Sequence, residues 1–192
     1  MSPELTVVKV GGSLLSDAGR LRAVLTGLAE GRDGPCVVVP GGGPFADAVR
    51  TSQAALGFGD ALAHRLALDA MGRMAEIFSA FEPRLRIATT WDAASTIFAR
   101  GGVPVWDPVA LKAGHPDIPE TWAVTSDSLA VWFATHRGAP RCVLVKSALV
   151  PMGAQPEELA RLGLVDAAFP AFAARYSGEI VLRGPSDMRE AA

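Results

Sequence analysis

The chain has 192 residues, of which 49% are hydrophobic and 20% are charged, and its formal net charge at pH 7 is −2. This composition is typical of a globular protein and excludes an intrinsically disordered chain. The length favours a single domain over residues 1–192 with one well-buried core. The small negative charge gives no electrostatic reason to expect nucleic acid or an anionic membrane as a partner.

The sequence carries no signal for secretion, membrane insertion or a protein-bound metal. The N-terminal MSPEL leads directly into a strand pattern, and no apolar run approaches the roughly 20 residues of a membrane span. The 3 histidines are scattered, without a CxxC or HExxH motif. Cys36 and Cys142 lie in apolar runs and are expected to be buried thiols. We therefore expect a soluble, cytoplasmic protein without a metal site.

Short β-branched runs alternate along the chain with longer helical patterns. In chain order the pattern predicts a strand over 5–10, a helix over 21–29, a strand over 36–39, helices over 45–55 and 60–81, a strand over 85–89, a helix over 91–100, a strand over 103–106, a helix over 126–135, a strand over 141–146, a helix over 156–162 and a strand over 179–183. This alternation implies parallel βαβ crossovers. It predicts the α/β class, as a three-layer αβα sandwich around a mainly parallel central sheet. The proline-containing segment 107–124 indicates a loop, either beside a binding site or simply on the surface.

Two glycine-rich turns follow predicted buried strands. Gly11-Gly12-Ser13 follows the first strand, and Gly41-Gly42-Gly43 follows the second. Ligands of open parallel sheets bind beyond the carboxyl ends of the strands, where glycine lets backbone N–H groups approach an anion. Neither turn fits the GxGxxG or GxxxxGK[ST] pattern. The turns alone therefore indicate an anion site or merely two tight turns.

Two lysines and an aspartate stand in unusual places. Lys9 interrupts an apolar strand and Lys146 ends another, so each ammonium is costly unless it meets an opposite charge or a ligand. Asp127, at the start of a predicted helix, is the candidate partner of both. The alternatives are that Lys9 reaches the surface and that Asp127, alone or with Ser126, caps its helix. Together with the glycine turns, the three groups favour phosphoryl transfer, which depends on placing cations around an in-line phosphoryl group.

These segments resemble the amino-acid-kinase superfamily, which includes uridylate, acetylglutamate, carbamate and isopentenyl phosphate kinases. The resemblance is carried, in the family's order, by VKVGGS at 8–13, VVPGGGPFAD at 38–47, TSDSLA at 125–130, VLVKS at 143–147 and LGLVDAAF at 162–169. It implies ATP as phosphoryl donor, Mg²⁺ that arrives with ATP, a small-molecule phosphate acceptor and a homo-oligomer. The stretch after Lys146 is shorter than the family's usual nucleotide-base region, which implies a reduced nucleotide-binding part.

The resemblance also implies roles for single residues. The catalytic set would be Lys9, which stabilises the transferring phosphoryl group, Asp127, which organises the two lysines, and Lys146, which contacts the nucleotide phosphates. Further nucleotide contacts would come from Gly11, Gly12, Ser13 and Ser147, with backbone donors from Gly11 and Gly12. The acceptor would be held by Gly41, Gly42, Gly43, His64, Arg65 and Ser126.

Within the family, the segments 63–71 and 118–127 look most like the methanofuran-pathway kinases that convert (5-(aminomethyl)furan-3-yl)methyl phosphate to a diphosphate. A kinase that forms an acyl phosphate on an amino acid, a uridylate-type kinase and a non-catalytic nucleotide- or oxyanion-binding protein stay open as alternatives. His64 and Arg65 would line the acceptor pocket or occupy a core or surface position on their helix. Trp122 would cover the substrate or anchor its loop.

Overall fold

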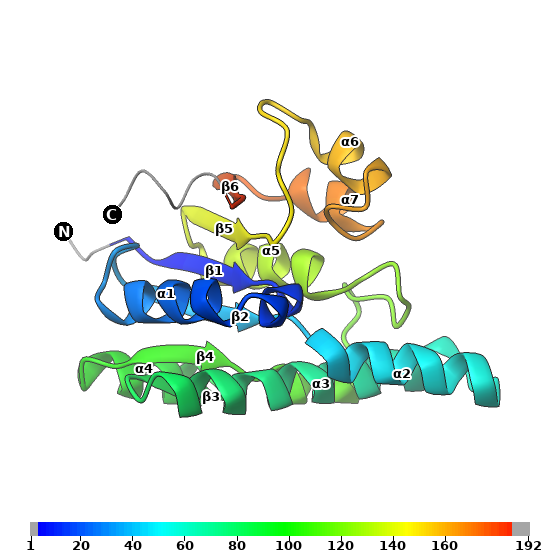
Figure 1. Cartoon of the computed structure of the whole chain (residues 1–192), viewed down its shortest axis with the longest axis horizontal. Coiled ribbons are helices and arrows are strands. Elements are labelled where there is room, and N and C mark those ends of the chain that lie inside the picture. The colour runs from blue at the N-terminus through cyan, green and yellow to red at the C-terminus, as the bar shows by residue number, and fades with distance from the viewer. Residues whose placement is uncertain (1–3, 186–192) are drawn as a thin grey trace.

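The computed structural model describes residues 4–185, and its centre is a six-stranded sheet in the order β3-β4-β2-β1-β5-β6. All neighbouring strands are parallel, which confirms the predicted architecture (Figure 1). The strands are β1 Thr6–Val10, β2 Cys36–Pro40, β3 Leu85–Ala88, β4 Val103–Trp106, β5 Arg141–Val145 and β6 Glu179–Arg183. β1 and β2 are buried along their whole length, as continuous apolar runs in a doubly covered parallel sheet require.

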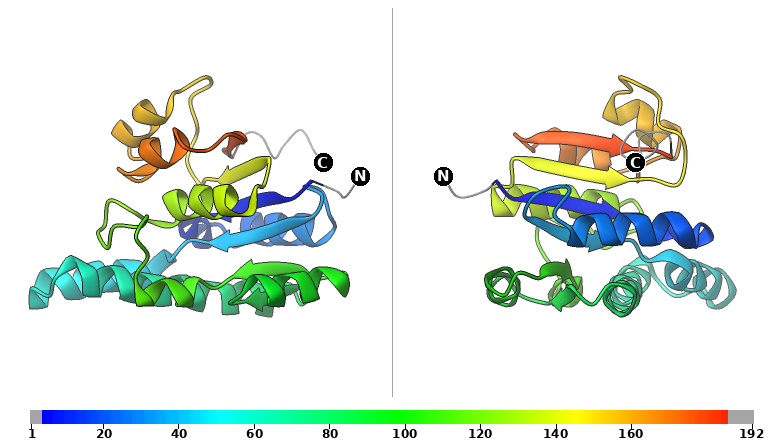
Figure 2. Two further views of the ribbon diagram at one scale, coloured as in Figure 1. Left: turned by 180° about the vertical axis from the view of Figure 1, so that it is seen from behind. Right: turned by 60° about the vertical axis from the view of Figure 1, so that its left-hand side comes forward.

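Helices cover both faces of the sheet and form the outer layers of the sandwich (Figures 1 and 2). They are α1 Ala18–Ala29, α2 Gly43–Leu56, α3 Asp60–Phe81, α4 Trp91–Ala99, α5 Ser126–Arg137, α6 Pro156–Arg161 and α7 Phe169–Ala173. Alternate residues of β1 belong to two hydrophobic cores: Val8 to the core that includes residues of α1, and Val7 to the core that includes residues of α5 and α7. Within residues 4–185, no helix combines the length and the apolarity that crossing a membrane requires.

The helix ends differ from the predicted ones for local reasons. α1 begins three residues early because the Asp17 side chain accepts a hydrogen bond from the Arg20 N–H at 3.0 Å and caps the helix. α5 continues to Arg137, where Gly138 in the left-handed region (φ 59°) ends it. The predicted helix at 45–55 begins earlier, directly on the second glycine turn. The five-residue helix α7 was not predicted.

The predicted loop 107–124 contains a short 3₁₀ helix, η2 Pro108–Ala113, and an isolated bridge between His115 and Ile118. The remainder runs past the carboxyl ends of the strands to the start of α5. Both cysteines are free and buried, as expected, and burial raises the pKa of each thiol to about 12.

Candidate active site

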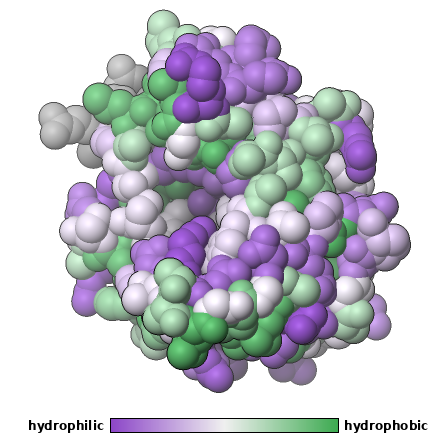
Figure 3. All heavy atoms as spheres, turned by 90° about the vertical axis from the view of Figure 1, so that its right-hand side faces the viewer, coloured by the Kyte–Doolittle hydropathy of each residue, from purple (hydrophilic) through white to green (hydrophobic). Residues whose placement is uncertain are grey.

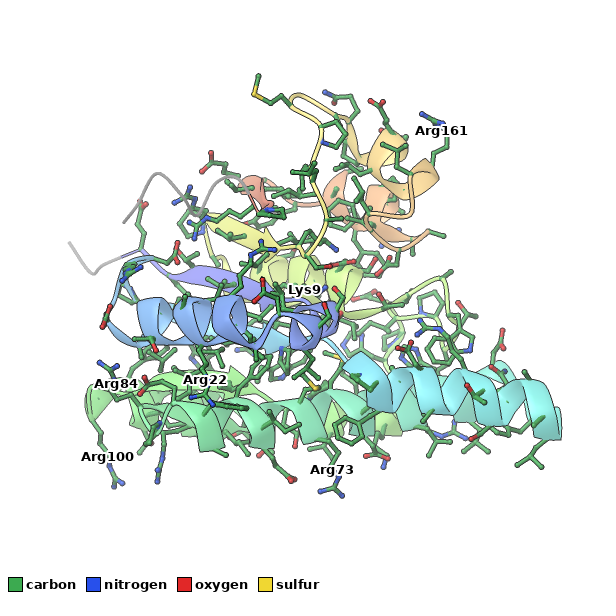
Figure 4. The ribbon with its side chains drawn as sticks, in the orientation of Figure 1. Lys9, Arg22, Arg73, Arg84, Arg100 and Arg161 are labelled. Atoms are coloured by element: carbon green, nitrogen blue, oxygen red, sulfur yellow. The ribbon has the colours of Figure 1, made fainter. Side chains whose placement is uncertain are left out.

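Two lysines share one aspartate at the carboxyl ends of β1 and β5. The Lys9 Nζ lies 2.9 Å from Asp127 Oδ1, and the Lys146 Nζ donates a 2.6 Å hydrogen bond to the same oxygen. All three side chains are buried. Figure 4 shows Lys9 near the end of β1 in the interior of the molecule, whereas Arg73, Arg100 and Arg161 project away from it. The convergence of these three groups, expected from the sequence, is therefore present.

The electrostatics of the cluster are those of two ammoniums and one carboxylate. Burial alone would raise the pKa of Asp127, but Lys9 and Lys146 lower it below the ordinary value, so Asp127 is a carboxylate. Burial and the neighbouring Lys9 lower the pKa of Lys146 to about 8, against the opposing effect of Asp127. With both lysines charged, the cluster has one positive charge in excess, which favours an anion beside it.

Asp166, and not Asp127, accepts the hydrogen bonds of the N–H groups at the start of α5. Asp166 accepts hydrogen bonds from the Thr125 N–H (2.9 Å), the Thr125 hydroxyl (2.8 Å) and the Ser128 N–H (3.0 Å), and also from the Ser128 hydroxyl. The capping alternative for Asp127 is therefore wrong, and its side chain is turned to the lysines. The LGLVDAAF segment around Asp166 is part of the family resemblance, but the sequence indicated no role for Asp166 itself.

The two glycine turns lie backbone against backbone. A Cβ built on Gly12 would lie 2.2 Å from the Gly43 nitrogen, and one on Gly41 would lie 2.6 Å from the Gly12 nitrogen. Only glycine permits this approach. Gly43, at φ 54°, is the first residue of α2, so the positive end of that helix dipole faces the turns.

The predicted backbone donors need a correction at Gly11. Its N–H donates to the Val145 carbonyl (3.2 Å), and the Gly41 N–H likewise donates to the Val10 carbonyl (2.8 Å), so both groups are used in joining the turns to the sheet. Within residues 4–185, the N–H groups of Gly12 and Gly43 have no protein acceptor. Both lie at the first residue of a helical segment and can donate to an anion.

A cavity of about 530 Å³ opens above the turns and the Lys9 side chain. Figure 3, viewed from the side toward which the strands point, shows a hollow bordered by hydrophilic side chains. The cavity is bounded by both glycine turns, by α2 and α3, by Trp122, Val124 and Thr125 of the loop before α5, and by Ser126, the first residue of α5. Lys146 and Gly11 lie outside its lining, although Lys146 contacts the same Asp127 oxygen as Lys9, which lines the cavity.

The predicted acceptor residues separate in the structure. The glycines 41–43, Ser126 and His64 line the cavity, and burial lowers the pKa of His64. At neutral pH His64 is thus a neutral imidazole with one N–H donor and one acceptor nitrogen, and the backbone of Thr121 is one of its hydrogen-bond partners. Arg65 points elsewhere: it is absent from the lining and its Nη1 lies 3.0 Å from Glu120 Oε2. The role predicted for Arg65 is therefore wrong, because the side chains of consecutive helical residues do not share a face.

The hydroxyls of Ser13 and Ser147, to which the resemblance gives nucleotide contacts, are 2.8 Å apart, so the first glycine turn lies against the end of β5. Beside Trp122, which the sequence had singled out, the cavity is lined by Asp47 and Arg50, to which sequence reasoning gave no role. The Arg50 guanidinium lies 4.1 Å above the centre of the Trp122 ring and 3.2 Å from Asp47. Gln53 accepts a 2.6 Å hydrogen bond from the Trp122 indole. Asp47 and Arg50 lie one helical turn apart after the glycines, the only signal that sequence reasoning had for them.

The fold and the site together define an α/β protein with a buried lysine–aspartate cluster and two packed glycine turns at the carboxyl ends of parallel strands. The family model of the amino acid kinase family matches residues 4–148, so the chain belongs to that family. Over 126 residues it is 31% identical to [5-(aminomethyl)furan-3-yl]methyl phosphate kinase of Methanocaldococcus jannaschii. That alignment covers 66% of this chain and 58% of the relative.

Solved structures share the fold at lower sequence identity. Uridylate kinase from Archaeoglobus fulgidus superposes with a TM-score of 0.66 at 17% identity, over 97% of this chain and 94% of the other. UMP kinase from Bacillus anthracis gives 0.70 at 14% identity, over 100% and 92%. Aspartate kinase from Synechocystis gives 0.68 at 18% identity, over 94% of this chain but 37% of the other. These likenesses support the fold and leave the acceptor open.

Proposed function

We propose that this protein transfers the γ-phosphoryl group of ATP to a small phosphate monoester and releases a diphosphate. The observation that carries the proposal is the pair of buried ammoniums on Asp127, beside a cavity whose glycine turns present free N–H groups. Negative charge moves between donor and acceptor oxygens during phosphoryl transfer, and fixed cations and N–H dipoles stabilise it without reorganisation. The reaction needs no nucleophile from the protein, because the acceptor phosphate oxygen attacks.

The residues present fit a nucleotide phosphate. Lys9 would contact the transferring group, and Lys146 and the Ser13–Ser147 pair would lie on the nucleotide side. Both lysines contact the same oxygen of Asp127, and Asp166 is engaged at the start of α5. Mg²⁺ would therefore be held mainly by phosphate oxygens, where it supplies further charge neutralisation.

For the acceptor we propose (5-(aminomethyl)furan-3-yl)methyl phosphate or a methanofuran-type analogue, as named for the Methanocaldococcus relative. Such a molecule has a phosphate at one end, a flat ring and a cationic amine. Gly43 and the neutral His64 suit the phosphate, and the half-buried Trp122 suits the ring. Asp47 lines the cavity as an exposed carboxylate and suits the amine. An amino-acid or uridine monophosphate acceptor would leave this combination of groups unused.

The test is ATP consumption with a panel of acceptors: aminomethylfuran methyl phosphate, its analogue without the amine, UMP, other alkyl monophosphates and amino acids. We expect turnover with the first and a loss of about 10²–10³-fold in kcat for Lys9→Ala, the size typical of a removed transition-state donor. Lys112→Ala is the matched control, because Lys112 forms a half-exposed pair with Asp69 outside the cavity and should retain full activity. Unchanged turnover in Lys9→Ala would refute the role of Lys9.

Acceptor choice is tested separately at Asp47. We expect Asp47→Asn to raise KM for the amine-containing acceptor about tenfold and to leave KM for the amine-free analogue unchanged. A tenfold change is the size expected for the loss of one ion pair between the carboxylate and the amine. An equal change for both acceptors would show that Asp47 acts only by holding Arg50. Turnover of UMP or an amino acid alone would replace the proposed acceptor but keep the kinase.

A further inference from the structure

Two of the chain's three histidines, far apart in the sequence, meet on the surface away from the cavity. His115 and Asp117 lie in the loop before α5, and His136 lies in the last turn of α5. The ligand atoms of these three residues all lie within 4.8 Å of one another. We propose that His115, Asp117 and His136 form a binding site for a divalent transition-metal ion of the zinc class.

The separations are close to those of a coordination shell. With bonds of about 2.0–2.1 Å, two ligand atoms in a tetrahedral site lie about 3.3–3.4 Å apart. Asp117 Oδ2 is 3.8 Å from His115 Nδ1 and 3.7 Å from His136 Nε2. These distances are too long for direct hydrogen bonds and a few tenths of an ångström longer than metal ligation needs. Side-chain rotation of exposed groups covers that difference.

The imidazole of His136 is oriented as a metal ligand would be. Its Nδ1 lies 2.9 Å from the Trp132 carbonyl, which can only accept, so Nδ1 carries the proton. Nε2 is left with its lone pair on the side of Asp117. Metal-binding histidines commonly use such a carbonyl to fix the tautomer and the ring. The ring also packs on Trp132, with centroids 4.2 Å apart.

His115 is held against the same tryptophan. Its ring meets Trp132 edge-on, with centroids 5.0 Å apart, and its Nδ1 accepts a 3.2 Å hydrogen bond from the Asp117 N–H. That bond keeps Nδ1 unprotonated, and a metal ion would displace it. The site thus has two imidazoles and one carboxylate, with room for water at a fourth position because all three residues are partly exposed.

The ligand set determines which ion is expected. Imidazole nitrogen favours Zn²⁺, Co²⁺, Ni²⁺ or Cu²⁺, whereas Mg²⁺ and Ca²⁺ prefer oxygen. The site is therefore distinct from any Mg²⁺ that accompanies ATP. A bound ion would tie the loop that continues to Trp122 and Thr125, two cavity residues, to the far end of α5. The ion's role would be to hold this loop in place.

The test uses the full chain, free of affinity tag, treated with chelator and without ATP at pH 7.5. Zn²⁺ titration by calorimetry should give one ion per chain, and Co²⁺ should give visible absorption of a tetrahedral nitrogen–oxygen site. His136→Gln and Asp117→Asn should each weaken binding at least about tenfold. His64→Gln, which changes the buried histidine of the cavity, is the matched control and should bind as the wild type does.

Three outcomes would overturn the proposal. They are the absence of saturable Zn²⁺ binding, equal weakening in His64→Gln, and a sulfur-to-cobalt charge-transfer band, which would assign the ion to Cys36 or Cys142. Thermal melting in chelator verifies that each variant is folded. If His136→Gln is destabilised, His115→Gln, on the loop, provides the same test. Loss of kinase activity in any assay leaves this result untouched, because binding is measured without substrate.

Discussion

Replacing Asp127 by asparagine removes the one negative charge that Lys9 and Lys146 share while it preserves the shape of the side chain. The carboxylate is buried and both ammoniums contact the same oxygen. Keeping an unpaired charge buried costs about 3–5 kcal/mol. Lys146 can instead lose its proton, which costs less free energy because its pKa is already lowered to about 8. At pH 7, releasing a proton from a group with that pKa costs about 1.4 kcal/mol.

The variant should therefore stay folded and lose a charge. The direction in which stability changes with pH follows from the lowered pKa of Lys146. Between pH 8 and the ordinary pKa of 10.5, the native state binds fewer protons than the unfolded state, so stability rises with pH in this range. The cost of keeping Lys146 charged is fully present below pH 8 and disappears as pH rises toward 10.5. Without Asp127 the pKa falls further, so the neutral form dominates at neutral pH.

The assay is kcat/KM against pH for wild type and Asp127→Asn, with urea unfolding of both. Wild-type activity should fall as pH rises through about 8, where Lys146 loses its proton. In the variant, this decrease of kcat/KM on the alkaline side of the pH profile (the basic limb) should move to lower pH. At pH 7.5, kcat/KM should be about 10²-fold or more below that of the wild type. A basic limb that stays in place would refute the reasoning. So would a loss of 3–5 kcal/mol in stability with normal activity of the folded fraction.

Three further changes follow from the same contacts. Gly12→Ala should cost about 1–3 kcal/mol in urea unfolding, because its Cβ would lie 2.2 Å from the Gly43 nitrogen. Gly59→Ala has no atom within 4 Å of the new Cβ and should cost less, about 0.5 kcal/mol for a poorer N-cap of α3; equal effects would contradict the packed turns. Asp166→Asn should lower the free energy of unfolding by about 1–3 kcal/mol and also lower kcat, since it removes a hydrogen-bond acceptor at the start of α5. A loss of stability without a change in kcat would exclude a role of Asp166 in positioning Asp127. Cys36 and Cys142 should react with a thiol reagent only on unfolding, because burial raises their pKa to about 12; rapid reaction of the native chain would show that they are accessible.

The sheet could be predicted because its signals are local. Apolar runs such as Thr6–Val10 and Cys36–Pro40 are suited only to burial on both faces, and glycine or proline ends them. α3 was predicted with its observed ends, because a long apolar periodicity between Gly59 and Glu82 allows no other structure. The short helix α7 could not be predicted, since five residues carry less than two turns of periodicity.

The lysines and Asp127 could be found because a charge inside an apolar strand requires an explanation. Groups that meet across long sequence separations leave no such sign. Asp166 reaches Ser128 across 38 residues, and Trp122 reaches Gln53 across 69. The failure at Arg65 has the same origin, because periodicity places the helix but the partner, Glu120, comes from a distant loop.

The excess positive charge of the lysine cluster links anion binding to proton uptake. An anion beside Lys9 and Lys146 favours their charged forms, so it should raise the pKa of Lys146 above about 8. At pH 8–8.5, where a fraction of Lys146 is neutral, binding of ATP should then take up part of a proton, and the uptake should vanish in Lys146→Met. Calorimetry in two buffers of different ionisation enthalpy measures this proton directly. ATP should also raise Tm more in the wild type than in Lys9→Ala, because the ligand stabilises the state to which it binds more tightly. Binding of ATP without proton uptake at pH 8–8.5 would show that Lys146 does not sense the phosphates, and its role would then be to hold Asp127 alone.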